Sequence, residues 1–264
     1  MIQFLAIRKS DRPLGVILHE GTSPFADAPY VVIAVLGDSD NEKTGEMVQT
    51  YIIRSDMRPN EAVNAEQDEA ICGGCPMRQF TADDGRKVRG CYVNVGQGPL
   101  GVYEAYRRGR YAPYSSIAHD RYFAGRMIRW GTYGEPVLIP LRIVQHLSSL
   151  ASGWTGYTHA WNAPEFQPFR RYFMASVHRE TGPLSAEHAR HLHWRWFQSS
   201  TGDEPPRGSI LCPASEEAGK RLQCHECGIC NGARNDSDRR VSVYIPVHGG
   251  LHAQHSFAHI PALN

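Results

Sequence analysis

The sequence has no long apolar segment and no strong excess of charge. Its 264 residues contain no apolar run of about 18 residues, so we expect no membrane-spanning helix. The first residues lack a basic stretch followed by an apolar block and a cleavage site, so we expect no signal peptide and a cytoplasmic protein. A formal net charge of +1 gives no overall electrostatic argument for nucleic-acid binding. Internal repeats and low-complexity segments are also lacking.

Hydrophobic residues make up 41% of the chain, which is enough for a packed core. We expect a single α/β domain over residues 1–247 and a histidine-rich tail over 248–264. Within the domain we expect a β-rich N-terminal part (1–66), a first cysteine loop (67–93), strand–helix repeats (94–211), and a second cysteine cluster with the last strand (212–247).

Runs of apolar and β-branched residues predict the strands of this domain. The expected strands cover residues 3–7, 14–19, 30–36, 48–54, 127–130, 155–161, 172–177, 193–198, 209–211 and 241–247. Helical spacing of apolar residues predicts helices over 99–108, 143–151 and 184–190. From about residue 125 strands and helices alternate, and this pattern predicts parallel strands with helices outside them.

The first cysteine group is Cys72, Cys75 and Cys91, with the spacing Cx2Cx15C. Two thiolates in a CxxC loop can face one metal centre, and a third cysteine that returns from a short excursion makes three ligands. A structural zinc ion takes four ligands, whereas a [4Fe–4S] cluster held by three cysteines keeps one iron open. A zinc site with a distant His or Asp as fourth ligand is the alternative, and this stretch alone does not decide between the two.

The second cysteine group is Cys212, Cys224, Cys227 and Cys230. In a cytosolic protein, cysteines with CxxC spacing are metal ligands more often than disulfide partners. A CxxCxxC run with a remote cysteine followed by proline is typical of ferredoxin-type iron–sulfur sites, and it favours a cluster here. Zinc stays open as an alternative, because His225 could replace one cysteine in a zinc site.

The order of these features resembles that of radical S-adenosylmethionine (radical SAM) enzymes. In that superfamily a three-cysteine loop follows the first barrel strand, and a Gly-Gly-Glu-Pro motif follows the second. Here Cys72, Cys75 and Cys91 are followed, after a short strand, by Gly134-Glu135-Pro136. The resemblance covers roughly residues 48–247, although the family's usual spacing is CxxxCxxC. The chain also resembles cysteine-rich proteins carried by phages and plasmids.

The resemblance implies a partial (β/α) barrel-like parallel sheet with a β-rich N-terminal segment and a cysteine-rich, metal-binding C-terminal region. The open iron of the first cluster would bind the amino and carboxylate groups of S-adenosylmethionine, and an electron donor would be a partner. The backbone of Gly134, Glu135 and Pro136 would lie along the methionine amine. The second cysteine group would hold an auxiliary cluster or a zinc ion. The substrate, a small molecule or a nucleotide, and the catalytic residues stay undefined.

A second class of function is a zinc-stabilised protein that binds or nicks nucleic acid, in which both cysteine groups are structural. His191 and His193 match the histidine–hydrophobic–histidine pair of rolling-circle nickases, and in a strand they would share one face. The C-terminal tail carries His248, His252, His255 and His259, and the last three have helical i, i+3, i+7 spacing. They could form a metal-binding face, and a plain polar tail is the alternative.

Overall fold

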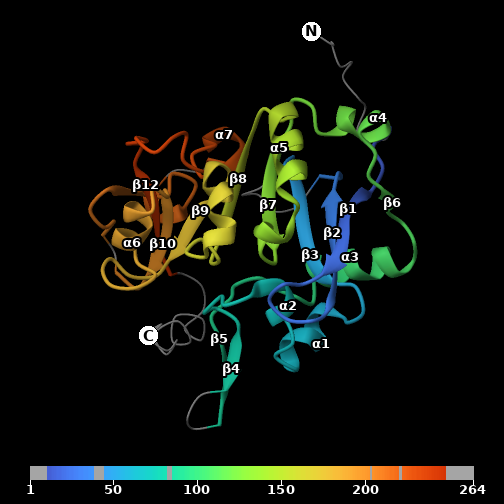
Figure 1. The fold of residues 1–264 in the computed structure, drawn as a ribbon, viewed down its shortest axis with the longest axis horizontal. Coiled ribbons are helices and arrows are strands. Elements are labelled where there is room, and N and C mark those ends of the chain that lie inside the picture. The colour runs from blue at the N-terminus through green and yellow to red at the C-terminus, as the bar shows by residue number, and fades with distance from the viewer. Residues whose placement is uncertain (1–10, 39–44, 82–84, 203, 220–221, 248–264) are drawn as a thin grey trace.

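The computed structural model describes residues 11–38, 45–81, 85–202, 204–219 and 222–247 (Figure 1). The strands of the main sheet are β1 (Gly15–Thr22), β2 (Pro29–Val35), β3 (Val48–Arg54), β6 (Ala112–Pro113), β7 (Met127–Tyr133), β8 (Gly153–Thr158), β9 (Met174–Val177), β10 (Trp196–Ser200), β11 (Ser209–Leu211) and β12 (Ser242–Pro246). A separate hairpin pairs β4 (Gln79–Thr81) with β5 (Lys87–Arg89). The helices are α1 (Pro59–Asn64), α2 (Glu69–Cys72), α3 (Gly98–Arg107), α4 (Ser116–His119), α5 (Leu141–Leu150), α6 (Ala186–His191) and α7 (Cys224–Cys227).

The main sheet has ten strands in the order β11-β12-β10-β9-β8-β7-β3-β2-β1-β6. Every neighbouring pair from β11 to β3 is parallel, whereas β3, β2 and β1 are joined by antiparallel pairing. The predicted α/β class, with parallel strands in the C-terminal half, is therefore confirmed. The strand expected at residues 3–7 lies outside the described residues.

Two elements show how the sequence selects this arrangement. The five central residues of β2, from Tyr30 to Ala34, are all buried, as expected for a β-branched strand inside a sheet. Helix α5 follows Pro140 and buries Val144 and Leu147 on one side, because residues three apart lie on one face of a helix. The predicted strand at 48–54 coincides with β3, and the predicted helix at 99–108 corresponds to α3.

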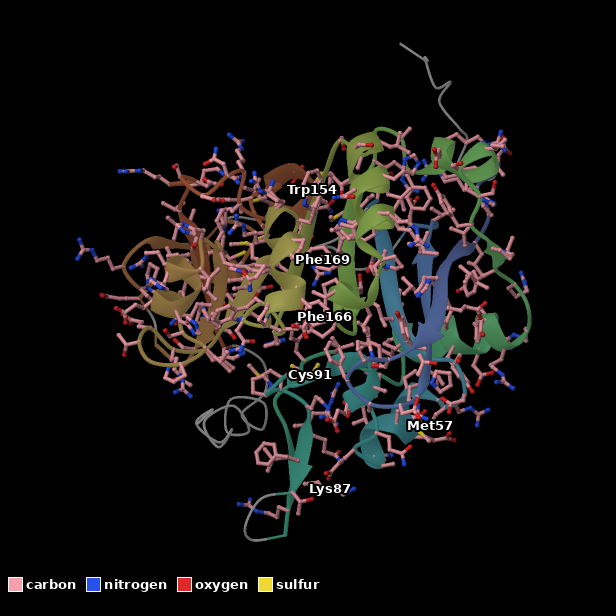
Figure 2. The ribbon with its side chains drawn as sticks, in the orientation of Figure 1. Met57, Lys87, Cys91, Trp154, Phe166 and Phe169 are labelled. Carbon is pink, nitrogen blue, oxygen red and sulfur yellow. The ribbon has the colours of Figure 1, made fainter. Side chains whose placement is uncertain are left out.

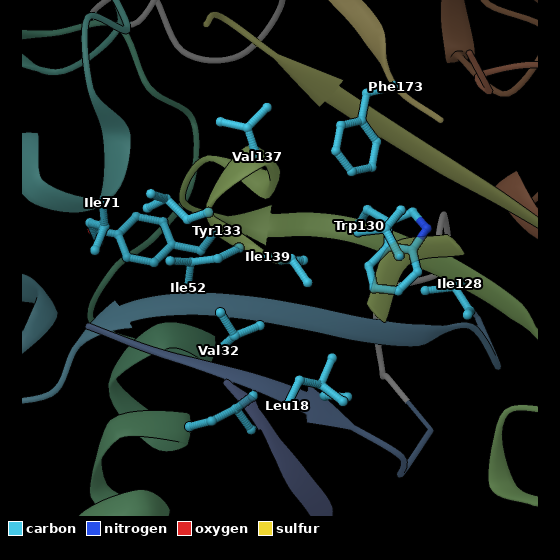
Figure 3. Packing of buried hydrophobic residues seen from close by; sticks show 14 of the residues in the cluster. Leu18, Val32, Ile52, Ile71, Ile128, Trp130, Tyr133, Val137, Ile139 and Phe173 are labelled. Atoms are coloured by element: carbon cyan, nitrogen blue, oxygen red, sulfur yellow. The ribbon is translucent and has the colours of Figure 1, made fainter. Parts of the chain in front are cut away.

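The two faces of the parallel sheet differ in chemistry. One face belongs to the main hydrophobic core and carries Ile128 and Trp130, with Phe173 packed nearby (Figure 3). Gly156 permits this close packing, since a Cβ there would lie 2.7 Å from the Phe173 ring. The alternating register places Arg129, beside Thr155, on the opposite face. We call this opposite face, which also carries Tyr157 and Phe197, the second face.

Within the described part of the chain, no helix combines the length and the apolar character that a membrane crossing requires.

Candidate metal centres

The first cysteine group is gathered by a helix end and a hairpin. Cys72 is the last residue of α2, and Gly73 then turns the chain with φ of +52°. The Cys75 amide donates to the Cys72 carbonyl (3.1 Å), and the Cys91 amide donates to the Met77 carbonyl (2.8 Å). The β4–β5 hairpin thus returns Cys91 to the CxxC turn, and Figure 2 shows Cys91 at the base of that hairpin. The sequence did not predict α2 or this hairpin.

The pKa shifts of these thiols show that the three cysteines lie near one another. Burial raises the pKa of the Cys72 thiol, and the nearby Cys75 and Cys91 raise it further. Burial also raises the pKa of Cys91, although the positive charge of Arg89 opposes this shift. The three thiols therefore lie within electrostatic range of one another. No cysteine among the described residues forms a disulfide.

Arg78 holds together the segment that leads into this cysteine loop. Arg78 donates from Nε to the Asp68 carboxylate (2.9 Å) and from Nη2 to the Glu66 carbonyl (2.6 Å). A longer bond joins its Nη1 to the Gly73 carbonyl (3.4 Å). Because the Asp68 residue is only 2% exposed, this ion pair is held inside the loop. The turn that carries Cys72 and Cys75 is therefore braced from within the loop itself.

The Gly134-Glu135-Pro136 segment lies against the same loop. The Glu135 amide donates to the Ile71 carbonyl (2.7 Å), one residue before Cys72. Gly134 has φ of +81°, and a Cβ there would lie 2.7 Å from the Ile52 Cβ, so this position requires glycine. Figure 3 shows Ile71 beside Ile52 in this region. The motif and the cysteine loop are thus in direct contact.

The Glu135 side chain has a role that the sequence did not reveal. The carboxylate accepts hydrogen bonds from Thr158 Oγ1 (2.5 Å) and from the His159 amide (2.9 Å). His159 Nδ1 lies 3.2 Å from the same carboxylate, and the Glu135 residue is only 4% exposed. The side chain therefore ties the end of β7 to the end of β8.

His159 continues this network toward the first cysteine group. Its Nε2 atom lies 3.8 Å from Cys75 Sγ and 3.1 Å from His178 Nε2. His178 Nδ1 in turn lies 3.0 Å from Ser199 Oγ. Burial alone would lower the pKa of His159, but Cys75 and Glu135 raise it to about 10. Burial and the neighbouring His159 lower the pKa of His178 to about 3. Sequence reasoning missed this row, whose members follow or end three successive parallel strands.

The second cysteine group gathers against the second face. Cys212 follows β11, and its amide donates to the Tyr244 carbonyl of β12 (2.7 Å). Cys224 and Cys227 begin and end α7, which Gly228 terminates in a left-handed conformation. Burial raises the pKa of Cys230 to about 12, and nearby Cys212, Cys224 and Cys227 contribute to that shift. The other three cysteines of the group therefore lie within electrostatic range of Cys230.

Cys230 belongs to the packing of the sheet. Its carbonyl accepts a hydrogen bond from the Gly156 amide of β8 (3.1 Å). Its side chain is buried in a small apolar cluster with Met174 and Val243. Burial raises the pKa of Tyr157, and the Tyr157 hydroxyl forms a hydrogen bond with the Cys230 sulfur.

Arg129 lies between the two cysteine groups. Its Nη2 atom donates to the hydroxyl of Tyr92, the residue after Cys91, at 3.3 Å. Burial alone would lower the Arg129 pKa, but Tyr92, Tyr157 and the thiols Cys224 and Cys230 raise it. Within the described residues Arg129 forms no ion pair with a carboxylate. A lone arginine in a strand gives no sequence signal for such a position.

Other predicted metal ligands are placed differently. His191 ends α6, and His193 lies in a turn with φ of +61°, so the expectation that both lie in a strand is wrong. Leu192 and His193 close the helix, and β10 begins only at Trp196. His225 Nδ1 faces Gly45, where a Cβ would lie 3.2 Å away. The tail histidines at positions 248, 252, 255 and 259 lie outside the described residues.

These observations define a largely parallel α/β protein whose sheet carries two separate cysteine groups. In the described residues, no set of three or more His, Cys, Asp or Glu side chains is arranged to hold a metal ion as it stands. Comparison with family models, with curated proteins and with solved structures gave no match.

Proposed function

We propose that the chain is an iron–sulfur enzyme similar to radical SAM enzymes, built on a partial (β/α) barrel-like sheet. One observation carries this proposal: three cysteines gather after β3, and Gly134-Glu135-Pro136 after the adjacent β7 is hydrogen-bonded to their loop through Ile71. Function-bearing loops of parallel α/β folds gather at the carboxyl ends of the strands, which is where both features lie.

The residues fit a cluster held by Cys72, Cys75 and Cys91. The Tyr133 hydroxyl is buried without a hydrogen-bond partner, and the charges of Cys72 and Cys91 act on it. Such an orphaned donor suits the sulfur atoms of a bound cluster.

When bound, such a cluster would hold the amino and carboxylate groups of S-adenosylmethionine at its open iron and supply the electron for reductive cleavage. The protein would supply position. Gly134 allows the backbone to approach closely, Pro136 favours the extended geometry that Glu135 adopts, and the Glu135 carboxylate fixes His159 beside Cys75. An external electron donor would be required.

We assign the second group, Cys212, Cys224, Cys227 and Cys230, to an auxiliary cluster or a zinc ion. Four cysteines complete a closed site, which suits electron transfer or a structural role rather than substrate binding. Arg129 and the Tyr157 hydroxyl would offset the negative charge of such a site.

Anaerobic purification and reconstitution, followed by metal and sulfide analysis, tests the proposal. We expect iron and acid-labile sulfide, a brown absorbance and calorimetric binding of S-adenosylmethionine. Cys91→Ala should abolish that binding, whereas Glu104→Gln, at an exposed pair with Arg58, should keep it. A colourless parent protein with stoichiometric zinc would refute the enzyme.

One observation favours the alternative of a zinc-stabilised nucleic-acid-binding protein. His159 Nε2 lies 3.8 Å from Cys75 Sγ, so His159 could serve as the fourth ligand of a zinc site at the first group. In that case His159→Ala should lower the zinc content of the first group. In the enzyme, the same change should leave the iron content intact, because three cysteines suffice to hold the cluster.

A further inference from the structure

A cavity of about 500 Å³ lies at the amino ends of β10 and β12, outside both cysteine groups. Trp196, the first residue of β10, and Ser242, the first residue of β12, line it. Four arginines also contribute to its wall. These are Arg190, Arg195, Arg239 and Arg240. The volume falls within the range of pockets that hold small molecules, about 300–1,000 Å³.

The carboxylates at this cavity already have partners. Asp236 pairs with Arg170 (2.5 Å), and Asp238 pairs with Arg240 (2.6 Å). Hydrogen bonding from Arg240 holds the pKa of Asp238 below its usual range, so this carboxylate stays charged. The cavity therefore gains no uncommitted negative charge from its own acidic residues.

Two arginines at the cavity remain without acidic partners. In the part of the chain that the structure describes, neither Arg190 nor Arg239 forms an ion pair, and both residues are exposed. Arg190 is held in place, because its guanidinium lies 4.9 Å from the centre of the Trp196 ring and its Nη2 lies 3.5 Å from the Arg207 carbonyl. A positioned guanidinium loses less freedom when it binds an anion than a mobile one does.

Arg195 and Trp196 lie in the cavity wall, but each has a buried donor without a partner. The Nη atoms of Arg195 donate hydrogen bonds to the carbonyls of Ile229, Asn231 and Val241. Its Nε atom is buried and has no hydrogen-bond partner. Trp196 Nε1 is likewise buried without an acceptor. Because these two donors are buried, the exposed guanidiniums of Arg190 and Arg239 are the groups that a ligand can reach, and they suit a ligand that is rich in acceptor oxygens.

We propose that this cavity binds the phosphate groups of a small phosphorylated molecule of nucleotide size, with Arg190 and Arg239 as the residues that contact phosphate. Arginine pairs with phosphate through two parallel hydrogen bonds, which is the geometry that its planar fork provides. The volume exceeds the needs of a lone phosphate ion, so the ligand carries further atoms beyond the phosphate. This site is independent of the metal chemistry proposed above.

Calorimetric titration of the purified full chain with inorganic phosphate, pyrophosphate, AMP and ATP tests the proposal, with citrate as a polyanion that lacks phosphate. We expect ATP or AMP to bind more tightly than inorganic phosphate and citrate. Arg190→Gln and Arg239→Gln should each weaken that binding about tenfold or more. Arg108→Gln removes an exposed arginine at the end of α3 and should leave binding within about twofold.

Thermal melts of the same variants keep the test decisive. Arg239 is exposed and forms no ion pair among the described residues, so Arg239→Gln should fold as the parent does even if Arg190→Gln does not. Lack of saturable binding by every phosphate compound at millimolar concentration would overturn the site, as would equal weakening by Arg108→Gln. Tighter binding of a single-stranded oligonucleotide than of ATP would overturn the small-molecule assignment. None of these results depends on the cluster.

Discussion

The two cysteine groups lie at different places on the same parallel sheet, and they are built differently. Figure 2 shows Cys91 at one end of the strands and Trp154, the second residue of β8, at the other, while Figure 1 shows α7, which carries Cys224 and Cys227, at the end near Trp154. The first group lies beside the polar network of Glu135 and His159. The second group is packed into an apolar cluster around Cys230.

The difference lies in how each group joins the sheet. The first is an insertion between β3 and α3, held by its own hairpin and by the ion pair of Arg78 with Asp68. The second is part of the sheet's own packing, because the Cys230 carbonyl bonds to β8 and Gly232 lies against the backbone at Arg171. We therefore infer that the first group can change without unfolding the protein, whereas the second cannot.

The largest expected effect comes from breaking the second group. Removing one ligand from a closed site forfeits part of a metal-binding free energy that is on the order of 10 kcal/mol in zinc peptides. We expect Cys227→Ala to lower the melting temperature by roughly 10 °C or more, and Cys91→Ala by only a few degrees. Thermal melts of both variants after anaerobic reconstitution measure the contrast. Equal destabilisation would show that both groups are structural.

The next effect concerns the backbone beside the first group. Gly134→Ala places a Cβ 2.7 Å from Ile52 at φ of +81°, and the strain should cost about 3 kcal/mol. Gly101 offers a matched control, since it lies within α3 and an added Cβ there meets nothing within 4 Å. Gly101→Ala should be neutral or stabilise by about 0.5–1 kcal/mol. Urea unfolding of the two variants compares them, and similar free energies would contradict this account of Gly134.

A smaller loss is expected from Glu135→Gln, which keeps the shape of the side chain but replaces one acceptor oxygen by an amide donor. The buried carboxylate accepts bonds from Thr158 and from the His159 amide, so losing one should cost about 1–3 kcal/mol of unfolding free energy. Glu104→Gln, at an exposed pair with Arg58, should cost under about 1 kcal/mol. If Glu135→Gln proved as mild as Glu104→Gln, only the Glu135 backbone would matter.

The sequence predicted the strands better than it predicted the polar contacts around the cysteines. Buried strands such as β2 and β3 can be predicted from sequence, because a run of apolar residues is a local pattern. CxxC spacing likewise shows that Cys72 and Cys75 lie on one turn. The sequence also placed Gly134-Glu135-Pro136 after a strand, and the structure confirms this, because β7 ends at Tyr133.

The contacts that the sequence missed join residues far apart in the chain. Glu135 meets His159 across 24 positions, and Cys75 meets His159 across 84, so no local pattern contains either pair. The expected strand at 193–198 began too early because His193 alternates with the apolar residues that follow it, while its positive φ could not be read from residue types. Arg129 was overlooked for the same reason, because Tyr92, Cys224 and Cys230 lie far from it in the chain.

Arg129 tests how the two groups differ, since its guanidinium lies near Tyr92 of the first loop and near two cysteines of the second group. Its guanidinium lies near Cys224 and Cys230, whose thiolates would be negative when they hold a metal. We expect Arg129→Gln to lose metal from the second group about tenfold faster to a chelator, given the range typical for residues that support metal ligands. The exposed Arg121 is a control, and Arg121→Gln should release metal at the parental rate. Equal rates of metal release from the parent and both variants would show that Arg129 does not support the metal of the second group.

The smallest effect on stability, and the most specific for the first group, is expected from Tyr133→Phe. The Tyr133 hydroxyl is buried and has no hydrogen-bond partner, so its removal should change the unfolding free energy of the metal-free protein by less than about 1 kcal/mol. In the reconstituted protein the hydroxyl would gain a sulfur acceptor near Cys72, and losing that bond should lower the reduction potential on the order of 50 mV.

Tyr30→Phe is the matched control, because the Tyr30 hydroxyl donates to the Leu138 carbonyl (2.8 Å) and burial, not a cysteine, raises its pKa. That variant should lose stability, since it leaves a buried carbonyl without its donor, and it should keep the parental potential. Redox titration by electron paramagnetic resonance, together with urea unfolding, measures both quantities. A Tyr133→Phe protein that loses stability but keeps its potential would mean that the hydroxyl serves the core rather than the first group. The contrast between an exchangeable first centre and a structural second one would then rest on the cysteine variants alone.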